Sequence, residues 1–212
     1  MKIARKAFVA LLLVLLAIAG GRYALFSSAE PSGLPQPLQE QDEMTPEFAA
    51  MLKAGTPGEH HVYLNPMVGE WEGTFTMWMK PGDPPMKSTG TIKREWIFDG
   101  RFIKEEVEAT ADFGTFYGFG LIGYNNLDGQ YEVVWVDSTS TAIYTETGTF
   151  NPETKILTTR GSMRDPASGR IVNSRGVYDL SNPNRHTFSA YSVDERGREF
   201  KSMEGVAERK KK

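Results

Sequence analysis

The sequence predicts an all-β fold in which about ten antiparallel strands close into an up-and-down barrel. Within residues 114–150, three runs rich in Tyr, Phe, Val, Trp, Ile and Thr are divided by polar turns, and such residues favour a half-buried pleated surface. Similar runs recur at intervals of about 8–12 residues, the spacing typical of all-β domains. Their short connections make sequence neighbours also sheet neighbours. Because an open meander would leave two exposed edges, we expect a barrel and keep a β-sandwich as the alternative.

Turn residues set the limits of the expected strands. Asp99-Gly100 and Asp128-Gly129 are typical of tight hairpins, since glycine adopts a positive φ without steric cost. Pro81, Pro84 and Pro85 cannot continue a strand. The expected strands are residues 69–80, 86–98, 101–110, 114–124, 130–137, 141–150, 155–163, 170–180, 185–193 and 198–208.

The N-terminus has the pattern of an export signal. Lys2, Arg5 and Lys6 precede an unbroken apolar run at 7–19, which is followed by small residues. We expect residues 1–29 to be a cleaved signal peptide, or a membrane anchor formed by residues 7–26. In both cases basic residues stay inside, so the body of the chain is expected to be exported, as a periplasmic or extracellular domain.

Residues 30–57 are expected to form a linker rich in Pro and Gln that contains one short helix. Thr45 is a typical N-cap, Pro46 suits the first helical position and Gly55 suits the C-terminal end. We expect this helix to lie across a barrel mouth or to pack on the outside. The barrel domain then covers residues 58–208, and a basic tail covers 209–212.

Composition excludes several classes of function. The chain has no cysteine, which excludes disulfides, thiolate chemistry and cysteine-based zinc sites. Of 24 basic and 27 acidic residues, four basic ones lie in residues 1–29, which leaves 20 against 27 and a net charge of −7 for the rest. A nucleic-acid partner is therefore not expected. No nucleophile elbow or phosphate-binding loop occurs, so we predict no catalytic residue and no cofactor.

The three histidines give no clear metal site. His60 and His61 should point in opposite directions on an extended chain and therefore should not share a metal. His186 begins the ninth expected strand and is expected to be a hydrogen-bonded histidine at the barrel rim. A haem-binding barrel would need an inward axial histidine, for which His186 is the available candidate.

Alternation places charged and aromatic side chains on the same inward face. Arg94 and Glu105 should lie nearly opposite each other across the Asp99-Gly100 hairpin, with apolar neighbours on that face. Arg175 and Asp137 could join them; alternatively, these charges bridge across the barrel or face water. Aromatic side chains on the inward face either fill a small barrel or line a site for an apolar ligand. The candidate ligand-binding residues are Trp71, Arg94, Trp96, Glu105, Tyr124, Trp135, Asp137 and Arg175.

Four motifs occur in an order that is similar to a known family. They are Val68–Gly73 (VGEWEG), Asp99–Ile103 (DGRFI), Gly118–Asn125 (GFGLIGYN) and Trp135–Ser138 (WVDS). The set resembles the exported bacterial proteins of domain of unknown function 1579, except that Asn125 stands where that family usually has Asp. The resemblance covers about residues 58–208. It implies a lipocalin-like barrel and no particular reaction.

Three functions remain open on the sequence alone. The first is a binding module that holds a small, largely apolar ligand inside the barrel, with a charged side chain fixing a polar group. The second is an enzyme in which interior carboxylate and arginine side chains act on a small substrate. The third is a structural envelope protein with a filled barrel. The membrane is expected as a partner only through the N-terminal segment, if that segment is not cleaved.

Overall fold

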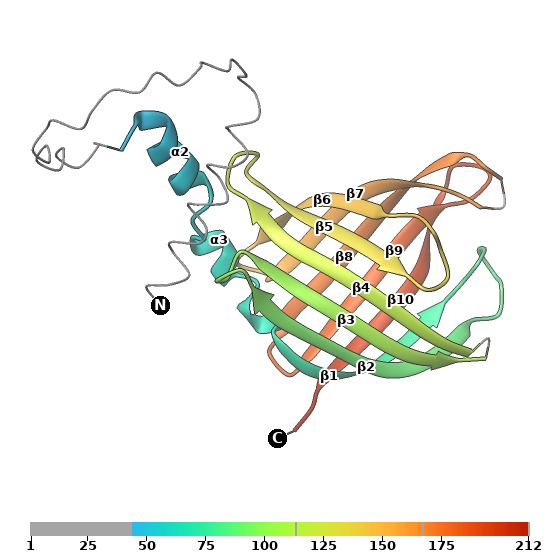
Figure 1. The fold of residues 1–212 in the computed structure, drawn as a ribbon. Coiled ribbons are helices and arrows are strands. Elements are labelled where there is room, and N and C mark those ends of the chain that lie inside the picture. Colours follow the sequence, from blue (N-terminus) through green and yellow to red (C-terminus); the bar gives the residue numbers. More distant parts are fainter. Residues whose placement is uncertain (1–43, 113, 167, 212) are drawn as a thin grey trace, which may run out of the picture. The chain divides into compact units, whose positions relative to one another are not determined.

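The computed structural model describes residues 44–112, 114–166 and 168–211 (Figure 1). The predicted signal or anchor at residues 1–29 and the linker up to residue 43 lie outside this part. Within the described residues, no helix has both the length and the apolar character needed to cross a membrane.

Ten antiparallel strands form a closed barrel, as the sequence predicted (Figure 1). Each strand pairs with its neighbours in sequence, and β1 also pairs with β10, with Trp71 opposite Arg209. This closure excludes the sandwich alternative. The strands are β1 (Gly69–Met77), β2 (Met86–Ile97), β3 (Phe102–Ala111), β4 (Gly114–Asn125), β5 (Gln130–Asp137), β6 (Tyr144–Asn151), β7 (Ile156–Arg164), β8 (Ile171–Asn182), β9 (Arg185–Val193) and β10 (Glu199–Arg209).

The two ends of the barrel differ in what lies next to them. We call the end at which β1 begins the helical end, because the helical segments lead directly into β1 there (Figure 1). The turns β2–β3, β4–β5, β6–β7 and β8–β9 lie at this end, since the even-numbered strands run antiparallel to β1. The other end, which we call the open end, carries the β1–β2, β3–β4, β5–β6, β7–β8 and β9–β10 connections.

The predicted short helix is present as α2 (Pro46–Ala54). Thr45 is its N-cap, and the Thr45 hydroxyl accepts a hydrogen bond from the backbone N–H of Phe48. The amide of Asn126, in the β4–β5 turn, donates to the carbonyl oxygens of Ala54 and Thr56, which holds the end of α2 at the helical end. None of the side chains of α2 is buried, so this helix does not close the barrel.

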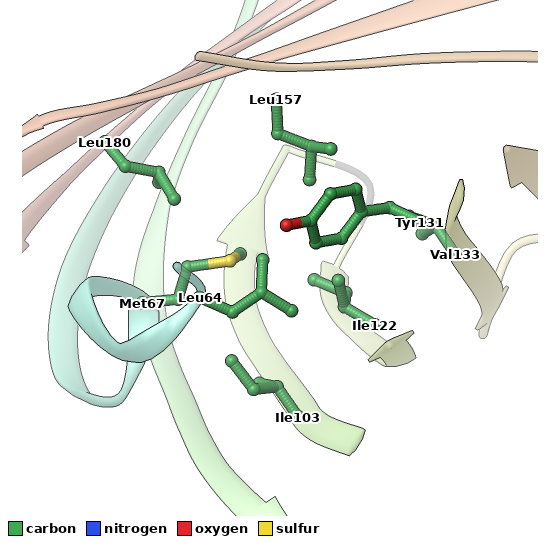
Figure 2. Close-up of a cluster of buried hydrophobic side chains, with 8 residues drawn as sticks. All are labelled: Leu64, Met67, Ile103, Ile122, Tyr131, Val133, Leu157 and Leu180. Atoms are coloured by element: carbon green, nitrogen blue, oxygen red, sulfur yellow. The ribbon is translucent and has the colours of Figure 1, made fainter. Parts of the chain in front are cut away.

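Two shorter helical turns close the helical end instead. They are α3 (Glu59–Val62) and the 3-10 turn η1 (Asn65–Met67), and their region contributes the fully buried side chains of Leu64 and Met67. These two side chains pack among residues from five strands (Figure 2). The Tyr131 hydroxyl donates to the His60 carbonyl at 2.9 Å. The cluster shown is Leu64, Met67, Ile103, Ile122, Tyr131, Val133, Leu157 and Leu180.

The sequence-based expectation that His60 and His61 lie on an extended chain was wrong. Both belong to α3, where the backbone N–H of Gly58 donates to His61 Nδ1 at 3.1 Å. A helix of four residues is too short to show a periodic apolar pattern, so the sequence carried no signal for it.

Candidate functional site: the barrel interior

Arg94 and Glu105 form an ion pair inside the barrel. They are direct partners across the β2–β3 hairpin, as predicted, and Arg94 Nε donates to the Glu105 carboxylate. The two residues are only 7% and 8% exposed. The desolvation cost of such a pair is offset only where its remaining polar atoms also find partners.

Those remaining atoms are not all paired. Within the part of the chain that the structure describes, three buried side-chain nitrogens have no hydrogen-bond partner: Arg94 Nη1 and both ring nitrogens of His186. An unpaired buried polar group costs about 1–3 kcal/mol, and native proteins rarely keep one without a reason. Arg94 lies close enough to His186 for its positive charge to lower the pKa of the imidazole.

His186 lies against Trp71 and not at a hydrogen-bonded position on the rim, which corrects the expectation from sequence. Its ring centroid is 4.3 Å from that of Trp71, and the residue is 3% exposed. Burial, together with the positive charges of Arg94 and Arg209, lowers the pKa of His186 to about 4. His186 is therefore a neutral imidazole at physiological pH, with one donor and one acceptor nitrogen.

Tyr178 presents a hydroxyl to the interior. Its side chain packs on Phe188 with ring centroids 4.6 Å apart, and it retains part of its accessible surface although it points inward from β8. The hydroxyl has no hydrogen-bond partner among the described residues. Burial raises the pKa of Tyr178, and the carboxylates of Glu105 and Glu146 raise it as well. Tyr178 is therefore a neutral hydrogen-bond donor.

A second carboxylate, that of Glu146, also lies on the inward face. It accepts hydrogen bonds from Thr159 Oγ1 at 2.5 Å and from Ser174 Oγ at 3.0 Å. No cationic side chain pairs with it among the described residues, so the interior near Tyr178 contains two carboxylates and one guanidinium.

The half of the barrel toward the open end is lined by aromatic rings. Phe75, Phe116 and Trp135 pack on a small buried cluster around Trp71, yet each keeps part of its surface accessible. The ring of Trp135 packs against Gly118 and Gly120: a Cβ atom at Gly118 would lie 2.3 Å from it. Glycine at this position leaves the inner wall free for a large ring.

Trp135 is fixed in place by Asp137. The indole Nε1 donates to Asp137 Oδ2 at 2.9 Å, while Oδ1 accepts from both the backbone N–H and the hydroxyl of Thr139. Asp137 thus orients a lining residue and does not join Arg94 and Glu105.

The other predicted site residues lie elsewhere. Trp96 donates to Asn65 Oδ1 at 2.9 Å, and Tyr124 stacks on His60 at 4.2 Å, so both belong to the packing of the helical end. Arg175 lies on the opposite face of β8 from Tyr178, where it pairs with Glu199 at 2.6 Å and covers the ring of Tyr191. The expectation that Arg175 joins the interior charges is therefore not met.

Sequence reasoning missed Tyr178, Glu146 and the environment of His186. On β8 it followed the set that contains Arg175, whereas the alternate set with Tyr178 and Leu180 faces inward. Leu180 is apolar, and residues two apart on a strand share a face, so alternation from Leu180 would have placed Tyr178 on the inward face. Nothing local in the sequence brings His186 to Trp71, because the two meet only when β10 joins β1.

The interior does not have the composition of a metal site. No group of three His, Asp or Glu side chains suited to a metal ion occurs within the described residues. A surface hollow of about 630 Å³ lies over the β6–β7 turn, between Thr149 and Thr158, and contains none of the interior polar residues. The barrel interior is therefore the better candidate.

Comparison with known proteins supports the fold. The family model described as "Protein of unknown function (DUF1579)" matches residues 56–209. Among solved structures, "Crystal Structure of Rv2717c from M. tuberculosis" aligns with a TM-score of 0.56 and 16% identity, covering 74% of this chain and 100% of that one. This similarity shows the fold alone. No curated protein matches the chain.

Proposed function

The chain belongs to the DUF1579 family, and on the geometry of its barrel interior we propose that it binds a small, largely apolar molecule that carries one neutral hydrogen-bond acceptor. The observation that carries this proposal is Tyr178, an inward-facing side chain with accessible surface whose hydroxyl makes no hydrogen bond among the described residues. Ligand sites in proteins combine an apolar wall with a few polar groups of this kind.

The aromatic lining supports an apolar ligand body. Phe75, Phe116 and Trp135 face inward without being fully buried, so additional apolar area remains to be covered there. A ring or short hydrocarbon placed against them would gain about 25 cal/mol for each Å² removed from water.

The charges around Tyr178 support a neutral polar group. Glu105 and Glu146 outnumber Arg94 at this position, so a ligand carboxylate would meet net repulsion. A carbonyl or ether oxygen avoids that cost and can accept from the Tyr178 hydroxyl. Arg94 Nη1 supplies a further donor close by, once small side-chain shifts expose it.

Three naphthalene compounds of similar size test this proposal by calorimetry on the full-length chain. We expect 2-acetonaphthone, which has a neutral carbonyl, to bind more tightly than 2-ethylnaphthalene, which has no acceptor, and far more tightly than 2-naphthoate, which is anionic. If 2-naphthoate binds best, or if none of the three binds, the proposal fails.

Replacing the key hydroxyl gives a second test. Tyr178→Phe should weaken 2-acetonaphthone binding by about five- to tenfold, the equivalent of one hydrogen bond, and leave 2-ethylnaphthalene unaffected. Tyr117→Phe is the matched control, because Tyr117 is 56% exposed on the outer face of β4. Equal effects of both variants would contradict the role of Tyr178.

We also propose that the domain acts outside the cytoplasm. This rests on the sequence of residues 1–19, where three basic residues precede an apolar run. Mass spectrometry of the N-terminus after expression in a bacterium decides between cleavage near residue 19 or 29 and retention of residues 7–26 as an anchor. Recovery of the intact chain from the cytoplasm would contradict export.

A further inference from the structure

Phe98 has a backbone conformation that its side chain does not favour. Its φ is +50°, the next residue, Asp99, has φ +56°, and Phe98 is 70% exposed at the tip of the β2–β3 turn. A bulky residue with positive φ is a true outlier, and such strain persists where the side chain has a use. The nearest ring, that of Phe102, is an edge contact at 6.5 Å, so packing does not account for Phe98.

Other apolar side chains project from the same end of the barrel. Leu127, in the β4–β5 turn, is 81% exposed, and Val62, at the end of α3, is 58% exposed. These turns all lie at the helical end, because β1 begins there and β2 and β4 end there (Figure 1).

The helix α2 adds an apolar face to this end. Phe48, Met51 and Leu52 follow a spacing of three and four residues, which places them on one side of the helix. They are 44%, 52% and 45% exposed, although the helix is held to the β4–β5 turn by Asn126. An amphipathic helix with an uncovered apolar face is typical of segments that lie in a membrane interface.

The sequence that precedes α2 indicates what covers this surface. The described part of the chain begins at Met44, next to α2. The sequence before it contains the apolar run at 7–19. If residues 7–26 are retained as a membrane anchor, the bilayer is an apolar partner within reach of this surface. Acidic residues such as Asp99 and Asp128 lie on the same turns as the apolar tips, so attraction by net charge is not the source of binding.

We propose that the helical end docks on a lipid bilayer, with Phe98, Leu127, Val62 and the apolar face of α2 entering the headgroup region. The proposal is independent of the ligand proposed for the interior. It makes the strained Phe98 an inserting side chain, and it places the open end away from the membrane.

Single-cysteine labelling of the full-length chain tests the proposal, because the natural chain has no cysteine. The variants Val62→Cys and Leu127→Cys are each labelled with bimane, which places one label at the helical end. Ile143→Cys, in the β5–β6 connection, and Ile171→Cys, at the start of β8, are matched controls at the open end, where the natural side chains are 71% and 68% exposed. After reconstitution into phosphatidylcholine vesicles, we expect the first two labels to shift to shorter emission wavelengths and to be quenched several-fold less by iodide than the controls.

Equal quenching at all four positions would overturn the proposal. Protection of the first two labels without vesicles would also overturn it, since that result would mean that a second copy of the chain covers the surface. Phe98→Gly gives an independent check: glycine relieves the positive φ, so the melting temperature should stay the same or rise while the label at position 127 loses its protection. A clear fall in melting temperature would instead assign Phe98 a structural role.

Discussion

The ring centroid of His186 lies 4.3 Å from that of Trp71, and both of its buried ring nitrogens lack a hydrogen-bond partner among the residues that the structure describes. Arg209 covers the same indole at 4.0 Å, so Trp71 contacts a neutral imidazole and a guanidinium. This arrangement joins β9, β10 and β1 at the closure of the barrel, and it couples the stability of that closure to protonation.

Stability should fall as the pH is lowered from about 6.5 to 4. The pKa of His186 is about 4 in the folded chain and 6.5 when unperturbed, so in this window the unfolded state binds a proton that the folded state does not. The difference corresponds to about 3 kcal/mol of unfolding free energy, lost progressively on acidification. Urea denaturation at several pH values measures it.

His186→Gln removes the titrating group from this position. The slope of unfolding free energy against pH should become shallower in the variant, whereas His60→Gln, which keeps His186, should retain the steeper slope. An unchanged slope in His186→Gln would mean that other groups dominate, including His61, whose pKa burial also lowers.

Glu105→Gln should destabilise the fold by about 3–5 kcal/mol, because it leaves the Arg94 guanidinium buried without its counter-charge. Glu95→Gln is the matched control on the opposite, outer face of the same hairpin, where Glu95 pairs with Lys104. Its effect should be much smaller. Chemical denaturation of both variants measures the difference. A Glu105→Gln variant of unchanged stability that lost turnover of a substrate would support an enzyme instead.

Gly118→Ala should displace the Trp135 ring from the inner wall. The added Cβ would lie 2.3 Å from the ring, while the indole is held by Asp137, so we expect a loss of about 1–3 kcal/mol and a changed tryptophan emission spectrum. Gly58→Ala is the control, because no atom lies within 4 Å of a Cβ built there. A Gly118→Ala variant as stable as that control would show that the ring moves freely.

Arg175→Ala should not change the affinity for 2-acetonaphthone, because Arg175 lies on the outer face with Glu199 and Tyr191. Only a small loss of stability is expected, as is usual for a surface ion pair. Isothermal titration measures the affinity, and a loss comparable to that of Tyr178→Phe would contradict this placement.

The amino-acid sequence by itself determined the ten strands, most of their limits and the pairing of Arg94 with Glu105. Each depends on residues close in sequence: a turn such as Asp99-Gly100 sets the register of its own hairpin, and alternation then places side chains on a common face. For the same reason the capped helix α2 could be predicted, with Thr45 and Gly55 as its ends.

Only the tertiary structure decided which distant side chains share the interior. The closure of β10 on β1 brings Arg209 and His186 to Trp71, and the barrel places Tyr178 near Glu105 and Glu146 from strands far apart in the sequence. The short helix α3, whose region contributes Leu64, could not be predicted from the sequence either. Contacts across a closed barrel depend on the number, tilt and stagger of all strands together, and no local sequence pattern contains that information.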